Sequence, residues 1–251
     1  MAPPTPTLLV FTLGAASERG RRRLLPRALE GMELGLRQAC LEGVLEAGAA
    51  CALRLEVCSP DKLLLPAGAA QVPQPGRDFG DRLERALHGA LERAAPGAPV
   101  VLVGSDVPGL AACHLAEAVA EAAANPRRVV LGPSPDGGFY LIAAAAPIPG
   151  LAAATRWCRR DTLAALCRSL AAGGREVVLL EPLADLDRPA DLDAWLATEG
   201  SGSERWRMLA NLLRRVLAER RRPLPSPGSD DLAPLLPTAL AGRAPPADLF
   251  H

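Results

Sequence analysis

The apolar residues of this 251-residue chain fall into short continuous runs separated by longer stretches with helical spacing. A typical run is "VVLV" at 100–103, which shows no polar alternation. Continuous apolar runs of this length are typical of strands that are buried on both faces of a sheet. We therefore predict six strands, at residues 8–13, 51–59, 99–105, 128–134, 137–145 and 175–182.

The stretches between these runs predict helices. The segment "LPAGAAQVPQPGRDFG" at 65–80 is rich in proline and glycine and is interpreted as a loop. Strands that alternate with helices form crossover units with a mostly parallel sheet. The predicted fold is therefore a doubly wound α/β domain, a three-layer sandwich of the Rossmann type. The helices are expected at 25–47, at 114–124, at 161–172 and at 189–196, and a further one follows the 65–80 loop and ends at about residue 93.

The C-terminal part of the chain has a different composition. We predict one domain over residues 1–198, followed by a linker that contains "GSGS" at 200–203. Residues 204–221 have the spacing of an amphipathic helix, which is a possible binding surface for a protein partner. The proline-rich remainder predicts an irregular tail.

Charge and cysteine content exclude several functional classes. Lys plus Arg and Asp plus Glu are balanced at 28 each, so no overall positive field favours nucleic acid. The six cysteines show no CxxC pair and no histidine at metal-ligand spacing, which argues against both structural zinc and a disulfide framework. A cytoplasmic, reducing location fits best. No apolar run approaches the length of a transmembrane helix.

Carboxylates follow several of the predicted strands. Asp106 comes after "VVLVGS", Asp136 lies in "GPSPDGGFYLI", and Asp185 and Asp187 lie in "LADLDRP". Ligands of open parallel sheets bind outside the carboxyl ends of the strands. Carboxylates gathered there suit Mg²⁺ or Mn²⁺ with phosphate oxygens. The alternative is that each aspartate only caps a helix or a turn.

Small and basic residues at the same strand ends are candidates for binding a nucleotide. Glycines allow a ligand to approach the backbone, and an arginine-rich loop after the first strand suits phosphate. The alternatives are that the glycines only form a turn and that the arginines only form a charged segment exposed to solvent. The candidate residues are Arg21, Arg23, Gly104, Ser105, Gly137 and Gly138.

Five ordered motifs together carry a family resemblance. They are "QPGRDFGDRL", "VVLVGSDVPGL", "VVLGPSPDGGFYLI", "RWCRRDTL" and "LADLDRPADL", and the resemblance that they carry covers about residues 70–196. In this order and spacing they resemble the bacterial DUF2064 family. Its members are similar to GT-A type glycosyltransferases and to small-molecule nucleotidyltransferases such as the molybdenum-cofactor guanylyltransferase.

The resemblance implies a transferase that uses a nucleotide-activated small-molecule donor. By position, Asp106 and Asp187 would hold Mg²⁺ or Mn²⁺ against the nucleotide phosphates. Asp106 and Asp136 are the implied catalytic carboxylates, with the segment 136–138 on the acceptor or sugar side. Gln74, Asp78 and Arg82 match a family motif to which the sequence assigns no role.

The N-terminal loop departs from the family pattern. Family members have a loop that resembles "KxPxPGxxKTRL" after the first strand, whereas this chain has "TLGAASERGRRRL" at 12–24. Arg21 stands where the family has lysine, and the Pro-Gly turn is absent. Arginine and lysine are not interchangeable around phosphate. The alternative hypothesis is therefore a scaffold protein that has kept the fold and lost the activity.

Overall fold

The computed structural model describes residues 4–14, 23–198 and 204–221. The chain divides into two compact units, residues 1–211 and 212–251. The first unit contains the whole sheet. The described part of the second is the C-terminal portion of one helix.

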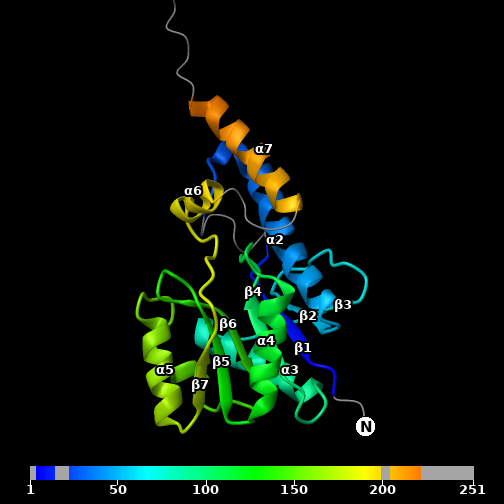
Figure 1. The fold of residues 1–251 in the computed structure, drawn as a ribbon, viewed down its shortest axis with the longest axis vertical. Helices are drawn as coiled ribbons and strands as arrows, with labels where there is room; N and C mark the ends of the chain where they lie inside the picture. The colour runs from blue at the N-terminus through cyan, green and yellow to red at the C-terminus, as the bar shows by residue number, and fades with distance from the viewer. Residues whose placement is uncertain (1–3, 15–22, 199–203, 222–251) are drawn as a thin grey trace, which may run out of the picture. The chain divides into compact units, whose positions relative to one another are not determined.

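Seven strands form a single sheet (Figure 1). The order across the sheet is β3-β2-β1-β4-β6-β5-β7, and every neighbouring pair is parallel except those made by β6. The predicted doubly wound, mostly parallel α/β fold is therefore confirmed. The strands are β1 (Thr7–Phe11), β2 (Arg54–Cys58), β3 (Ala69–Val72), β4 (Val100–Gly104), β5 (Arg128–Pro133), β6 (Phe139–Ala144) and β7 (Glu176–Leu179).

Helices cover both faces of this sheet. The helices α2 (Glu30–Ala50) and α4 (Ala112–Ala124) share one core with Leu8 and Val10 of β1. The helices α3 (Phe79–Arg93) and α5 (Thr162–Ala172) share the other core with Leu9 of the same strand. Successive residues of β1 thus face opposite layers, which explains why its sequence is continuously apolar.

The strand β3 was missed by the sequence analysis, which interpreted residues 65–80 as a loop. It lies at an edge of the sheet and pairs in parallel with β2, from Leu55↔Ala69 to Cys58↔Val72. Its side chains are exposed or half-buried. An edge strand held by backbone hydrogen bonds needs no apolar alternation, so the hydrophobic pattern gave no signal.

The first helix also begins later than predicted. Pro26 has φ −54° and ψ 148°, outside the helical region, and is followed by the 3-10 turn η1 (Arg27–Leu29). The α-helix proper therefore starts at Glu30 rather than near residue 25. This places Glu33 and Arg37 in its first two turns.

The remaining helices follow β7. They are α6 (Pro189–Ala197) and α7 (Glu204–Arg221). In the first unit, Trp206 of α7 is buried, and its ring meets Trp195 edge-on at 5.8 Å. A Cβ atom added at Gly43 of α2 would lie 3.0 Å from the Trp206 ring, so that glycine admits the indole.

The boundary at residue 198 and a protein partner for residues 204–221 stay predictions. The linker at 199–203 and the tail at 222–251 lie outside the described residues. Within the described residues, the helices are too short or too polar to cross a membrane.

Candidate functional site

Asp106 lies at the mouth of the central strand β4. Val100 to Val103 are fully buried or nearly so, and the strand ends at Gly104. A Cβ atom added at Gly104 would stand 2.8 Å from Asp106 Oδ1, so the carboxylate lies back against the end of the strand. The pattern of buried strand, glycine and aspartate thus delivers one carboxylate to the C-terminal edge of the sheet.

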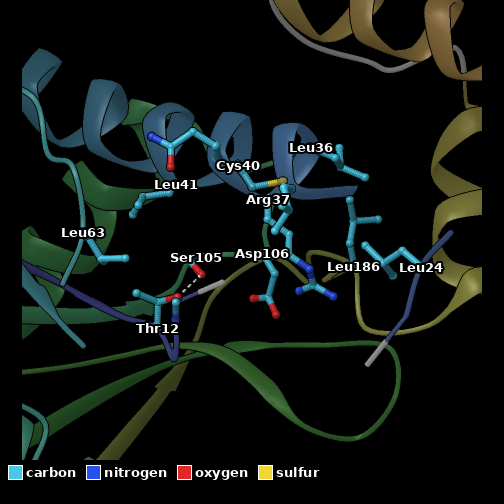
Figure 2. A pocket seen from close by; sticks show the side chains of 13 residues that line it. Thr12, Leu24, Leu36, Arg37, Cys40, Leu41, Leu63, Ser105, Asp106 and Leu186 are labelled. Atoms are coloured by element: carbon cyan, nitrogen blue, oxygen red, sulfur yellow. Dashed lines mark hydrogen bonds between the residues drawn. The ribbon is translucent and has the colours of Figure 1, made fainter. Parts of the chain in front are cut away.

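A pocket that is open to solvent lies at this edge between the ends of β1 and β4 and the helix α2 (Figure 2). Its apolar walls are leucines, among them Leu36, Leu41, Leu63 and Leu186. Such a mainly apolar pocket with a few polar groups is typical of a small-molecule site. The polar side chains that line it are Thr12, Arg37, Gln38, Ser105 and Asp106.

Hydroxyl groups connect the two central strands on the pocket floor. Ser105 Oγ donates to Thr12 Oγ1 at 2.9 Å, and the Gly14 amide donates to the same oxygen at 3.3 Å. Gly14 has φ +78°, a left-handed conformation that favours glycine. The backbone that leaves β1 is thereby fixed against the end of β4.

Arg37 reaches the pocket from α2 and is held by Glu33, one helical turn earlier. Arg37 Nη2 donates to Glu33 Oε1 at 3.1 Å, while Glu33 Oε2 accepts from the Leu25 amide at 3.2 Å. Glu33 is only 7% exposed, so this carboxylate is a buried anchor rather than a surface partner. Neither residue was predicted from the sequence. Their i, i+4 spacing was visible, but nothing in the sequence says which helix face meets the strand ends.

Cys40 also lines the pocket, without acting as a nucleophile at neutral pH. Burial, and secondarily the Asp106 carboxylate, raise the pKa of the Cys40 thiol to about 12, while Arg37 lowers it. The thiol therefore stays protonated. All six cysteines are free, which agrees with the prediction that the chain contains no disulfide framework.

Hydrogen bonds within the turn between β5 and β6 hold it closed. Gly138 N donates to Asp136 Oδ1 at 2.8 Å, and Gly137 N donates to Ser134 O at 3.1 Å. Gly137 has φ +91°, and a Cβ atom there would lie 1.7 Å from the carbonyl oxygen of Arg160. Gly137 therefore has a structural reason to be glycine, whether or not it contacts a ligand.

The segment after β7 brings Asp187 to the same edge. The amides of Leu180, Leu183 and Leu186 donate in turn to Leu131 O at 2.9 Å, Pro133 O at 3.1 Å and Asp106 O at 2.9 Å. The chain thus runs past β5 to the end of β4. Asp187 follows directly, next to the backbone of Asp106.

Asp185 is the most perturbed carboxylate of this segment. Burial, followed by the negative charges of Asp187 and Asp136, raises its pKa to about 6. Ser134 Oγ donates to its Oδ2 at 3.3 Å. The carboxylates of Asp187 and Asp136 thus act on Asp185 from the neighbouring backbone segments.

We expect Asp185→Asn to stabilise the metal-free protein at pH 8 but not at pH 3.5. The folded pKa of about 6 exceeds the ordinary value of 3.8, so the folded state holds this proton more tightly than the unfolded state. As pH rises from about 3.8 to about 6, ionisation of Asp185 therefore lowers the free energy of unfolding, by about 1–3 kcal/mol in total. Urea unfolding of both proteins at the two pH values measures this difference. Equal effects at both pH values would contradict it, and Asp161→Asn, at an exposed carboxylate, is the control.

The structure brings only part of the predicted site into one pocket. Ser105 and Asp106 line it. Gly104, Asp136, Gly137, Gly138 and Asp187 lie at the same sheet edge without lining it. Arg21 lies outside the described residues, and Arg23, half-buried, is the first described residue after that gap. Among the described residues, no three His, Cys, Asp or Glu side chains are grouped to hold a metal ion.

The motif that contains Gln74, Asp78 and Arg82 has a structural explanation. Gln74 Nε2 donates to Thr12 O at 3.0 Å and to Cys58 O at 3.1 Å, so one buried amide ties the ends of β1 and β2 together. Asp78 caps α3 by accepting from the Asp81 amide at 2.9 Å, and Arg82 Nε donates to Asp78 O at 3.2 Å. These residues shape the edge of the sheet beside the pocket.

Comparison with a family model agrees with the sequence motifs. The model described as "Uncharacterized protein conserved in bacteria (DUF2064)" matches residues 40–159, which confirms the resemblance. The matched residues include β2 to β6 with Ser105, Asp106 and the turn at 134–138. None of the curated proteins matches the chain.

Solved structures share the fold. A "putative nucleotide-diphospho-sugar transferase" from Desulfovibrio desulfuricans G20 superposes with a TM-score of 0.72 and 24% identity, covering 85% of this chain and 95% of that chain. Rv0371c from Mycobacterium tuberculosis H37Rv gives 0.47 and 16%, covering 77% and 98%. Its complex with manganese gives 0.46 and 15%, covering 78% and 100%. The first likeness shows a common α/β fold, and the other two are remote.

Proposed function

Because residues 40–159 match the DUF2064 family, we propose that the protein is a metal-dependent transferase that uses a nucleotide-activated donor, transferring a glycosyl or nucleotidyl group to a small molecule. The observation that carries this proposal is the Asp106 carboxylate, which lines the pocket at the C-terminal end of the central strand. This is the edge at which open α/β sheets bind nucleotides.

The residues present fit a hard divalent cation such as Mg²⁺ or Mn²⁺. Asp106 and Asp187 offer carboxylate oxygens on adjacent segments, joined by the Leu186 amide to Asp106 O bond of 2.9 Å. Mg²⁺ commonly takes one or two carboxylates and completes its shell with water and substrate phosphates, so a three-residue protein cluster is not required. When bound, the cation would neutralise the charge that develops on the diphosphate leaving group.

The chain itself would bind and orient the two substrates. Thr12, Ser105 and the leucines of the pocket would enclose the nucleotide, with Gly104 leaving room for the Asp106 carboxylate at the end of the strand. Gly137 and Gly138, at the same sheet edge, and Arg23, which precedes the pocket residue Leu24, are proposed to line the donor phosphates and the sugar.

Asp136 is proposed to act on the acceptor. Its carboxylate is exposed, and Oδ1 is engaged by the Gly138 amide at 2.8 Å. That bond fixes the carboxylate, so Oδ2 could accept a proton from an acceptor hydroxyl group. General-base catalysis of this kind contributes about 10²–10⁴-fold to rate.

A scaffold protein without activity is the second candidate, and the altered loop at 12–24 favours it. It predicts that no nucleotide binds and that substitution of Asp106 or Asp187 leaves the cellular role intact. The six free cysteines support the proposal of a cytoplasmic location for either candidate.

Calorimetric titration of nucleoside diphosphates, NDP-sugars and nucleoside triphosphates, each with Mn²⁺ or Mg²⁺, separates the two candidates. Binding to the wild-type protein supports the transferase. If none of these ligands binds, the transferase proposal fails and the scaffold protein is the candidate that remains.

A further inference from the structure

We propose that the loop at 155–161, between the 3-10 turn η2 (Leu151–Ala153) and α5, binds the phosphate group of a phosphorylated small-molecule acceptor and holds it beside Asp136. The inference rests on the proposed function, in which Asp136 acts on a hydroxyl group of the acceptor. It names a substrate class for that site and adds three binding residues, Arg156, Arg159 and Arg160.

The first observation is that this loop lies directly on the turn that carries Asp136. The amide of Leu163, in the first turn of α5, donates to Gly137 O at 3.0 Å. The carbonyl oxygen of Arg160 lies in the space beside Gly137, only 1.7 Å from the position that a Cβ atom would take there. The backbone of Arg160 is therefore in contact with the residue that follows Asp136.

The second observation is that hydrogen bonds fix the backbone of the loop. Thr162 is buried, and its Oγ1 accepts from the Arg159 amide at 2.9 Å and donates to Arg156 O at 3.2 Å. The Thr162 amide in turn donates to Arg159 O at 3.1 Å. One buried hydroxyl group thus brings the backbones of Arg156 and Arg159 together.

Trp157 anchors the middle of the same loop. Its ring packs between Phe79 at 5.6 Å and Phe139 at 6.2 Å, and its Nε1 donates to Ala152 O at 2.7 Å. The next residue, Cys158, has φ +59°, a left-handed conformation that is uncommon for a residue other than glycine. Strained conformations of this kind persist only where the surrounding structure enforces them, and they are frequent at binding sites.

The third observation concerns the charges that this fixed loop presents. Arg156, Arg159 and Arg160 are exposed, and no described residue forms a hydrogen bond or an ion pair with their guanidinium groups. By contrast, Arg128 on β5 is paired with both Glu121 and Glu176. A solvated run of charges needs no fixed, strained backbone, so the combination indicates an anion-binding loop.

A phosphate monoester is the anion that fits this loop best. It carries a charge of about −1.5 to −2 at pH 7 and has three strong acceptor oxygens. Guanidinium groups bind such oxygens in bidentate pairs, so several arginines can engage one phosphate. A carboxylate has one charge and two oxygens, which a single arginine would satisfy. The phosphate would serve as the group by which the acceptor is held, while its hydroxyl group lies toward Asp136.

The test measures phosphate binding without metal or nucleotide. Glycerol 3-phosphate is titrated into the isotope-labelled protein in excess chelator, and the indole N–H signals of the three tryptophans are followed by NMR. We expect the signal of Trp157, assigned with Trp157→Phe, to shift in a saturable manner, while the signals of Trp195 and Trp206 stay in place. Glycerol, which lacks the phosphate, should shift none of them.

The arginines are tested by Arg159→Gln combined with Arg160→Gln. This double variant should bind glycerol 3-phosphate at least about 10-fold more weakly, because it loses hydrogen bonds to a charged group. Both residues hold the loop through backbone atoms only, so the melting temperature should not fall. The control is Arg168→Gln, which removes an exposed charge from α5 outside the loop and should leave the affinity unchanged.

Three results would overturn the inference. They are the absence of a saturable shift of the Trp157 signal, an undiminished affinity in the double variant, and an equal loss of affinity in Arg168→Gln. The last result would show that the phosphate responds to the overall charge of the surface. The proposed function is tested by nucleotide binding in the presence of metal, so its failure and the failure of this phosphate site are separate results.

Discussion

Mn²⁺ together with UDP or GDP should raise the melting temperature of the wild-type protein, and Asp106→Asn should abolish the increase. A ligand that binds only the folded state stabilises it by about 2.7 kcal/mol at one hundred times its dissociation constant. Asparagine keeps the size of the side chain but removes the negative charge that attracts the cation. Thermal unfolding with and without metal and nucleotide measures both effects.

The matched control for this prediction is Asp161→Asn. Asp161 is exposed at the start of α5 and does not line the pocket, so the metal-dependent increase should be retained in full. A metal response that survives in Asp106→Asn would show that Asp106 is not the metal ligand.

Gly137→Ala should destabilise the protein by about 3 kcal/mol or more, through two effects that can be separated. The backbone at Gly137 has φ +91°, and a left-handed conformation costs a non-glycine residue about 1–2 kcal/mol. In addition, the new methyl group would lie 1.7 Å from the Arg160 carbonyl oxygen, so the turn or the loop before α5 must move. Urea unfolding measures the change in the free energy of unfolding.

Gly150→Ala isolates the backbone effect. Gly150 has φ +77°, and no atom lies within 4 Å of an added Cβ there. Its substitution should therefore cost only the conformational contribution, about 1 kcal/mol. Equal destabilisation by Gly137→Ala and Gly150→Ala would mean that the turn at 134–138 shifts at little energetic cost. The turn would then not be a rigid support for Asp136.

The fold was largely predictable because most strands of this sheet are buried on both faces. Residues 100–103 and 129–131 are apolar without interruption, and burial alone explains that pattern. The edge strand β3 was not predictable in this way, since its side chains face solvent and its register comes from backbone pairing with β2. The direction of β6, antiparallel between β4 and β5, follows from the short turn that joins it to β5.

The candidate site was predictable where it depends on strand ends. Asp106 follows a buried strand and a glycine, so its place at the sheet edge could be inferred from local sequence. Arg37 and Glu33 lie in the first two turns of α2, and only the packing of this helix over β1 and β4 turns them toward that edge. Gln74 likewise acquires its role from two strands that are distant in sequence, through its bonds to Thr12 O and Cys58 O.

We propose that the pocket beside Asp106 binds a nucleoside diphosphate through a divalent cation. Calorimetric titration of the wild-type protein with UDP and GDP, in Mn²⁺ and again in excess chelator, tests it most directly. We expect saturable binding of at least one of these nucleotides at a single site in Mn²⁺, and a large loss of affinity when the metal is removed. Absence of binding, or equal affinity with and without metal, would contradict it.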